Sequence, residues 1–198
     1  EEGAIVLAPS RAELDVSDAT SIEAFLAGLD SPVDILVNDA GINELSSLDA
    51  LEDDVLNRTI GTNLVGPVLL SRALIPRMAD RAWGRVVNIS SIWSVVAKAG
   101  RLPYAVSKAG LNGLTRALAV EYAAQGVLVN AVAPGFVMTK MTAQNNTETE
   151  LEAIRQLIPM RRMADPAEVA QLVAFLASSR NSFTTGQVIL CDGGFSIV

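Results

Sequence analysis

A tyrosine and a lysine four residues apart are the side chains of this sequence best placed for acid–base chemistry. Tyr104 and Lys108 would lie on one face of a helix, about one turn apart. A phenol with its ordinary pKa near ~10 is a poor acid–base catalyst at neutral pH until a fixed positive charge stabilises its phenolate. Lys108 would supply that charge. The spacing by itself also fits an exposed tyrosine beside a solvated lysine, so other residues have to support it.

The elements that position this pair can be predicted from short apolar runs rich in β-branched residues. These runs are too short for helices and are typical of strands buried on both faces of a parallel sheet. They cover residues 5–7, 33–37, 85–89, 127–132 and 187–190. Helical patterns alternate with them, at residues 21–29, 53–78, 104–125 and 166–178. The alternation predicts one α/β domain over residues 1–198, with a mainly parallel sheet and helices on both faces.

Ligands of such sheets bind beyond the carboxyl ends of the strands. The segments that follow the predicted strands are small or polar, as a close approach of backbone to ligand requires; they are residues 8–11, 38–41, 90–91 and 133–135. Ser91 lies there, thirteen residues before Tyr104. The polar stretch that begins at Thr142 is expected to form a substrate lid over residues 142–158.

Composition excludes several classes of function. The 198 residues include no His, which removes His-based catalytic triads and His-ligated metals, and we expect no metal site. The single Cys191 cannot form an internal disulfide, so a reducing compartment is expected. A net charge of −7 argues against a nucleic-acid partner. No apolar run reaches the ~18–20 residues that span a membrane, and the first residues do not resemble a signal peptide, so a cytoplasmic protein is expected.

Taken together, these residues resemble the short-chain dehydrogenase/reductase family in its single-domain form. The resemblance covers nearly the whole chain. It rests on Asn63, Ser91, Tyr104 and Lys108 and on the segments 14–18 (LDVSD), 38–41 (NDAG), 134–139 (PGFVMT) and 192–194 (DGG). Residues 134–142 and 162–168 look most like those of 3-oxoacyl-[acyl-carrier-protein] reductases. The resemblance implies a Rossmann-like, doubly wound α/β fold.

The resemblance implies roles for four side chains. Tyr104 resembles the general acid that protonates the reduced carbonyl oxygen, or takes the proton back in the oxidative direction. Ser91 resembles the hydroxyl that hydrogen-bonds the substrate oxygen where negative charge develops. Lys108 would lower the Tyr104 pKa and hold the nicotinamide ribose. Asn63 would kink its helix and position a water that relays protons to Lys108. The alternatives are a helix-surface amide for Asn63 and a strand-end cap for Ser91.

A nicotinamide cofactor, which carries the hydride, is also implied. Residues 3–11 resemble the family's second strand, whose tip meets the adenosine ribose. NAD-preferring members usually carry an acid there, whereas this chain has Ser10 and Arg11, which suit a 2′-phosphate. NADP(H) is therefore favoured over NAD(H); the alternative is that Arg11 points to solvent. Further contacts are implied for Asp15 and Val16 at the adenine, for Asn38, Ala40 and Gly41 along the cofactor, for Tyr104 and Lys108 at the ribose, and for Pro134, Gly135, Val137 and Thr139 at the nicotinamide end.

Two features depart from the family pattern. The glycine-rich turn between the first strand and first helix is absent, and residues 1–4 look like the tail of that helix. A βα unit of roughly 20–30 residues is thus expected upstream. Either the sequence is part of a longer polypeptide, which we favour because losing a central strand leaves backbone groups unpaired, or the protein begins here and lacks ordinary cofactor binding. In addition, Asp39 stands where the family usually has a second Asn.

These observations predict an NADP(H)-dependent oxidoreductase that interconverts a carbonyl and a secondary alcohol, with a 3-oxoacyl thioester as one candidate substrate. A polyol, sugar or hydroxysteroid dehydrogenase of the same family is the alternative, and Trp93, Val95 and Val96 would contact the substrate in either case. A catalytically silent relative that acts as a binding or scaffold subunit is a further reading. The expected partners are a small-molecule carbonyl or alcohol and, because the 104–125 helix is apolar nearly all round, further copies of the chain in a dimer or tetramer.

Overall fold

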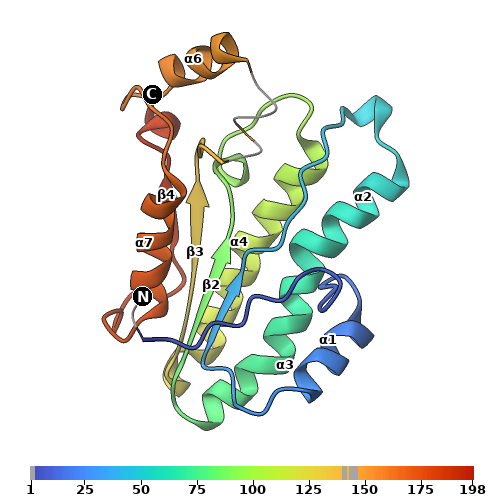
Figure 1. Cartoon of the computed structure of the whole chain (residues 1–198), viewed down its shortest axis with the longest axis vertical. Helices are drawn as coiled ribbons and strands as arrows, with labels where there is room; N and C mark the ends of the chain where they lie inside the picture. The colour runs from blue at the N-terminus through green and yellow to red at the C-terminus, as the bar shows by residue number, and fades with distance from the viewer. Residues whose placement is uncertain (1–2, 140–141, 143–146) are drawn as a thin grey trace.

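The computed structural model describes residues 3–139, 142 and 147–198. The described residues form a four-stranded parallel sheet in the order β1-β2-β3-β4 (Figure 1). The strands are β1 (Ile35–Asn38), β2 (Gly84–Ile89), β3 (Val127–Pro134) and β4 (Val188–Cys191). Four of the five predicted strands are therefore confirmed, with ends that differ by one or two residues. Because the strands are parallel, all their carboxyl ends meet at the upper edge of the sheet in Figure 1.

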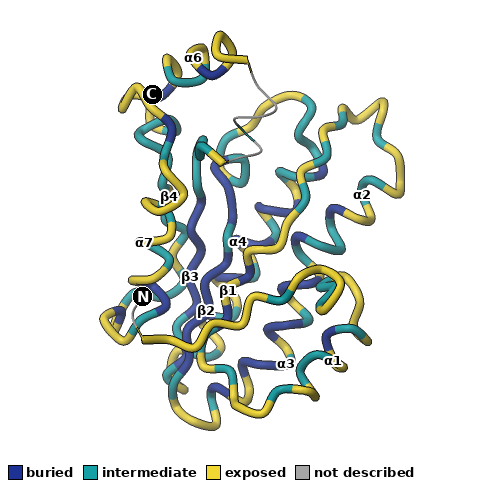
Figure 2. Tube along the Cα trace, viewed as in Figure 1, coloured by how far each residue is buried: buried dark blue, intermediate teal, exposed yellow. Residues whose placement is uncertain are grey.

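The apolar runs became strands because helices cover the sheet on both sides. Alternate residues of β2 and β3 point to opposite faces, so Val86 and Val129 join one core while Val87 and Val132 join the other. All four are fully buried, as the darkest stretch of the trace in Figure 2 shows. Such two-sided burial explains why these segments read as continuous apolar runs rather than as an alternating pattern.

Helices of two separate chain regions form the two outer layers. On one face lie α1 (Ala19–Ala27), α3 (Gly66–Asp80) and α4 (Leu102–Tyr122), and on the other lies α7 (Pro166–Ala177). Asp165 caps α7 in a capping box with Glu168, and Pro166 occupies the first turn. The doubly wound α/β fold is thus confirmed. Among the described residues, no helix has both the length and the apolarity needed to cross a membrane.

The predicted helix at 53–78 is interrupted by a single π-helical turn. It consists of α2 (Asp53–Ile60), the π turn Gly61–Val65 and α3. Asn63 lies within the π turn, where its side chain bonds the backbone of Ile42 instead of facing solvent. The expected kink at Asn63 is therefore present, and single π turns of this kind are frequent at functional sites.

The strand predicted at residues 5–7 is wrong. Residues 3–10 have no strand conformation, and the Ile5 and Val6 side chains are 95% and 78% exposed. Figure 2 shows this segment exposed along almost its whole length. A strand needs hydrogen bonds from a neighbouring strand, and no described strand lies along this segment. An apolar, β-branched composition alone was therefore insufficient to form a strand here.

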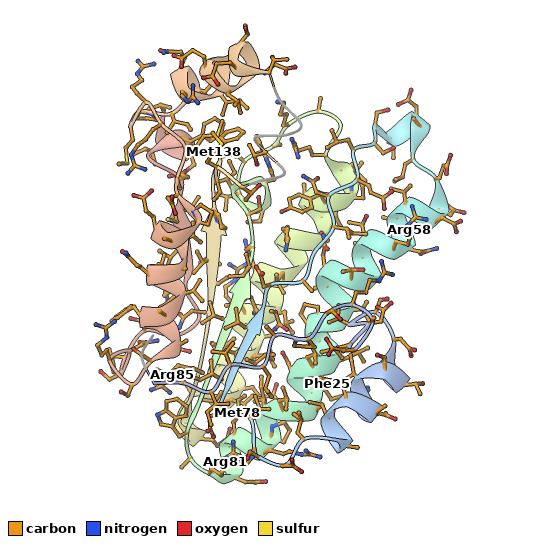
Figure 3. All side chains as sticks on the ribbon, in the orientation of Figure 1. Phe25, Arg58, Met78, Arg81, Arg85 and Met138 are labelled. Atoms are coloured by element: carbon orange, nitrogen blue, oxygen red, sulfur yellow. The ribbon has the colours of Figure 1, made fainter. Side chains whose placement is uncertain are left out.

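The predicted lid at 142–158 contains a helix that the sequence analysis did not assign. Residues 140–141 and 143–146 lie outside the described residues, whereas α6 (Glu148–Leu157) begins at a capping box between Thr147 and Glu150. Figure 1 shows α6 beyond the carboxyl ends of the strands. Its Leu151 packs in a small core with Ile158 and Met163, which holds the helix at this edge. Met138 at this edge and Arg85 at the start of β2 mark opposite ends of the sheet in Figure 3.

Candidate active site

The tyrosine, lysine and serine singled out from the sequence come together where β2 ends against α4. The Lys108 ammonium donates a hydrogen bond to the carbonyl of Ile89, the last residue of β2, at 2.7 Å. Its Nζ lies 5.7 Å from the centre of the Tyr104 ring. Ser91 lies two residues after the end of β2 and is 6% exposed. Tyr104 and Lys108 of helix α4 therefore lie beside the residues at the carboxyl end of β2.

The Tyr104 hydroxyl is held mainly in its protonated form. Burial raises the pKa of Tyr104, while a hydrogen bond with Ser91 and the positive charge of Arg101 lower it in part. Lys108 was expected to be the cation that lowers this pKa. The Lys108 ammonium is engaged with the Ile89 carbonyl, and Arg101 is the cation that acts on the phenol. Sequence reasoning missed Arg101, although it lies only three residues before Tyr104.

The Lys108 amine is almost completely buried, with 3% of its surface exposed. Burial lowers its pKa from 10.5 to about 8, and the nearby Asp39 carboxylate opposes this shift. Lys108 therefore remains mostly protonated at neutral pH but loses its charge under mildly alkaline conditions. Asp39, the departure from the family pattern, acts here as a negative charge that helps to keep the ammonium protonated.

Asn63 ties the loop after β1 to helix α4. Its side-chain oxygen accepts from the Ile42 amide at 2.8 Å, and its amide nitrogen donates to the Ile42 carbonyl at 2.9 Å and to the Ser107 hydroxyl at 3.0 Å. Asn63 is completely buried, which rules out the alternative of a helix-surface amide. Its role in relaying protons stays a prediction.

A second buried amide, Asn112, holds the loop that carries Ser91. The Ser90 hydroxyl donates to the Asn112 side-chain oxygen at 2.7 Å, and the Asn112 amide donates to the Ser94 hydroxyl at 2.8 Å. Ser94 in turn donates to the Ser91 carbonyl. Sequence reasoning missed this network. The available signal was that Asn112 lies one turn beyond Lys108 on the same face of the helix.

Gly41, which was expected to line the cofactor, lies beside the Lys108 ammonium. A Cβ added to Gly41 would lie 3.4 Å from both the Asn63 oxygen and the Lys108 nitrogen, so the glycine brings the backbone close to these two polar groups. Ala40 is exposed next to it.

Asn38 is engaged within the sheet. It is 5% exposed, and its amide donates to the Asn88 side-chain oxygen at 2.7 Å, while Asn88 donates to the Thr115 hydroxyl on α4 at 2.9 Å. Asn38 thus joins β1, β2 and α4. The Asn38 side-chain oxygen is buried without a donor among the described residues, so one acceptor at the end of β1 is left available.

At the adenosine end of the expected cofactor site, the polar contacts join residues that are close in the sequence. Ser10 donates its amide and hydroxyl to the Glu13 carboxylate at 2.7 and 2.8 Å, and Arg11 pairs with Asp15 at 3.3 Å. The Arg11 side chain is 80% exposed. Val16 packs closely on the start of α3, because a Cβ on Gly66 would lie 2.7 Å from its carbonyl oxygen. Glu13 was not singled out from the sequence, although it occupies the donors of Ser10.

The segment after β3 continues the same edge of the sheet. Gly135, which follows Pro134, donates its amide to the Cys191 carbonyl at 3.0 Å, and a side chain at Gly135 would clash with Asp192. Val137 pairs with Ala164 in an isolated bridge, and Thr139 shares a hydroxyl hydrogen bond with Thr142. The 134–139 and 192–194 motifs are therefore neighbours in space.

Three aromatic rings lie beside Ser91. Trp93, Phe136 and Phe195 contact one another edge to face, with ring centres 5.3 to 6.1 Å apart. The Arg101 guanidinium lies over the Trp93 ring, 5.1 Å from its centre. Trp93 was expected to contact the substrate, and the aromatic cluster is an apolar wall at that position.

The chain is similar to known proteins over most of its length. The family model described as Enoyl-(Acyl carrier protein) reductase matches residues 4–196. The 3-oxoacyl-[acyl-carrier-protein] reductase of Vibrio harveyi is 38% identical over 188 residues, which cover 93% of this chain and 77% of that protein. The chain therefore spans about three quarters of that relative's length.

Two solved structures share the fold. A gluconate 5-dehydrogenase from Burkholderia cenocepacia, in complex with NADP and tartrate, matches with a TM-score of 0.86 and 30% identity over 93% of this chain and 74% of that one. A mutant 4-hydroxyisoleucine dehydrogenase, complexed with NADH and succinate, matches with a TM-score of 0.88 and 31% identity over 93% of this chain and 78% of that one.

Replacement of Asn112 tests the network around Ser91. We expect Asn112→Leu to lower the free energy of unfolding by about 1–3 kcal/mol, because the Ser90 and Ser94 hydroxyls lose their buried partner. The amides of Ser94 and Val95 should also exchange faster with solvent, measured by hydrogen exchange. Asn57→Leu, at an exposed asparagine of α2, is the control and should change neither quantity appreciably. Unchanged exchange in Asn112→Leu would show that the amide does not hold this loop.

The buried charge of Lys108 predicts a pH-dependent stability difference. The folded state releases the Lys108 proton near pH 8 and the unfolded chain near 10.5, so folding is penalised below pH 8 and the penalty is lost as pH rises to 10.5. The native chain should therefore gain roughly 3 kcal/mol relative to Lys108→Met over this pH range.

Urea unfolding of both proteins at pH 7 and pH 10.5 measures this difference. Lys98→Met, at an exposed lysine, is the matched control and should differ from the native chain by the same amount at both pH values. If Lys108→Met behaves like this control, the Lys108 amine is not titrating in a buried environment.

Proposed function

The chain belongs to the short-chain dehydrogenase/reductase family of oxidoreductases, and we propose that it interconverts a carbonyl and a secondary alcohol with NADP(H), using Tyr104 as the general acid and base. The observation that carries this proposal is the meeting of Tyr104, Ser91 and Lys108 at the carboxyl edge of the sheet. A buried ammonium beside a half-buried phenol is expensive for stability, which supports a functional reason for the arrangement.

Tyr104 and Ser91 would act together on the substrate oxygen. In the direction of reduction, Ser91 donates a hydrogen bond to the carbonyl oxygen as negative charge develops on it, and Tyr104 transfers its phenolic proton to that oxygen. The bound cofactor supplies the hydride that the carbonyl carbon accepts. The raised pKa of Tyr104 keeps the phenol protonated before it gives its proton to the substrate oxygen.

Lys108 and Asn63 would prepare the place of the nicotinamide ribose. The ammonium lies beside Gly41, where it would donate to a ribose hydroxyl. Asn63 bonds both the amide and the carbonyl of Ile42 and thereby fixes the loop that carries Gly41. Lys108 would thus orient the cofactor, while its charge also favours the phenolate that remains on Tyr104 after proton transfer.

The proposed preference for NADP(H) depends on Arg11 and Ser10. The Arg11 guanidinium is exposed, and its contact with Asp15 is long at 3.3 Å, so it is available for a 2′-phosphate. Glu13 works against this preference because its carboxylate engages the Ser10 amide and hydroxyl. The related solved structures include one with NADP and one with NADH, which supports a nicotinamide cofactor in either form.

Two substrate classes are supported by different relatives. The Vibrio harveyi protein is a 3-oxoacyl-[acyl-carrier-protein] reductase, which supports a 3-oxoacyl thioester. The gluconate and 4-hydroxyisoleucine dehydrogenases support a small polar alcohol instead. Association into a dimer or tetramer stays a prediction, for which the 88% exposed Val120 on α4 offers an apolar contact.

Tyr104→Phe tests the proposed acid. Loss of the hydroxyl should lower kcat by about 10²- to 10⁴-fold, because the proton donor is removed while the ring that lines the site remains. NADPH oxidation with 3-oxoacyl thioesters and simple ketones measures the rate, and cofactor binding should change little. Tyr122→Phe removes the other tyrosine hydroxyl of the chain and should retain the native rate. A normal rate in Tyr104→Phe would refute the proposed role.

Cofactor preference can be tested at the adenosine end. Arg11→Met should weaken NADPH binding by about 10- to 100-fold and leave NADH binding nearly unchanged, because only NADPH carries the 2′-phosphate. Glu13→Gln should act in the opposite direction, since it removes a negative charge and frees the donors of Ser10. Fluorescence titration with each cofactor measures both effects. Equal losses for NADPH and NADH in Arg11→Met would contradict the proposed phosphate contact.

A further inference from the structure

The backbone of Arg101, which lies three residues before Tyr104 in the sequence, is held in place from two sides. It precedes α4 directly, and its carbonyl accepts the first helical hydrogen bond, from Ala105 at 2.8 Å. On its other side it pairs with Ser46 in an isolated parallel bridge, and the Ser46 amide donates to the Gly100 carbonyl at 3.0 Å. Residue 101 is therefore held between the helix that carries Tyr104 and the segment that follows β1.

The Arg101 side chain is also oriented. Its guanidinium lies over the Trp93 ring at 5.1 Å, and edge-to-face contacts with Phe136 and Phe195 fix the plane of that ring. Stacking of this kind covers one face of a guanidinium and leaves the donors on its edge available. Those donors match the two oxygens of a carboxylate in a bidentate arrangement.

The charge of Arg101 is not neutralised by the protein. No carboxylate in the described part of the chain lies within 4.0 Å of it, whereas Arg58, Arg155 and Arg162 each pair with a glutamate. The chain as a whole carries a net charge of −7, whereas Arg101 places a positive charge beside the phenol of Tyr104. Arg101 is only partly exposed, which strengthens its attraction for an anion relative to a fully solvated arginine.

We propose that Arg101, stacked on Trp93, is an anion subsite of the active site, and that the substrate is a small oxo or hydroxy acid whose carboxylate it binds. The inference rests on the proposed function and narrows it. Arg101 immediately precedes the helix that carries Tyr104, and its charge acts on the Tyr104 phenol, so the carboxylate would lie near the carbonyl that Tyr104 protonates. A neutral ketone or a thioester offers no charge at that position.

Pairs of substrates that differ only in the presence of a negative charge test the subsite. The native protein, with NADPH, is assayed on 2-, 3- and 4-oxo acids and on the corresponding amides, which have nearly the same shape without the charge. We expect kcat/KM to favour the best acid over its amide by about 10- to 100-fold. In Arg101→Met this ratio should fall towards one, while Arg101→Lys should retain part of it because the charge remains.

The ratio of kcat/KM for the acid to kcat/KM for its amide separates substrate recognition from a general effect on catalysis. Loss of Arg101 also raises the pKa of Tyr104, but that change affects the acid and its amide equally and cancels in the ratio. Arg116→Met, at an exposed arginine further along α4, removes the same charge away from the site and should leave the ratio at its native value. An acid-to-amide ratio that is the same in Arg101→Met and in the native protein would overturn the proposal.

If no substrate of the panel is reduced, that outcome counts against the proposed function. The anion subsite at Arg101 is then tested by ligand binding alone. Succinate and succinamide are then titrated calorimetrically into the native protein and into Arg101→Met. Succinate binding that is about 10-fold tighter to the native protein than to the variant, with no such difference for succinamide, supports the subsite. Equal binding of succinate to both proteins overturns it.

Discussion

The burial of one ammonium group governs the arrangement of this site. Lys108 is 3% exposed, and its ammonium donates to the last carbonyl of β2. A buried charge is tolerated only where polar groups face it, so α4 and the end of β2 must stay in contact at this point. Gly41 lies close to the same ammonium, and a side chain at Gly41 would meet both Lys108 and Asn63. The loop after β1 is therefore placed by the same group.

Buried amides extend this constraint to the neighbouring elements. Asn63 links the π turn to the loop after β1 and to α4, Asn88 links β1 and β2 to α4, and Asn112 links α4 to the loop that carries Ser91. A hydrogen bond inside a protein contributes little net stability, but an amide left unpaired costs about 1–3 kcal/mol. The network therefore excludes other packings of these elements more than it adds stability, which keeps Ser91 beside Tyr104.

The sequence predicts those features that follow from local pattern and topology. Strands β2 and β3 were found because two-sided burial leaves an unbroken apolar run, and Tyr104 and Lys108 because a helix places residues four apart on one face. The strand at 5–7 was wrong because strand formation depends on a partner that composition does not reveal. Arg101 and Asn112 were missed for a similar reason: their roles come from contacts with Trp93 and Ser90, which only the fold brings near.

The electrostatics of Tyr104 show where local reasoning is insufficient. Lys108 is only four positions along the helix, yet burial of the phenol outweighs the Ser91 hydrogen bond and the charge of Arg101, and the Tyr104 pKa is raised rather than lowered. The Lys108 charge is itself weakened by burial, which lowers that pKa to about 8. A site with a protonated phenol and an uncompensated Arg101 beside it is arranged to give a proton to an oxygen on a negatively charged molecule. The same burial that makes Tyr104 a donor also reduces screening around Arg101, so acid catalysis and anion recognition would depend on one desolvated environment.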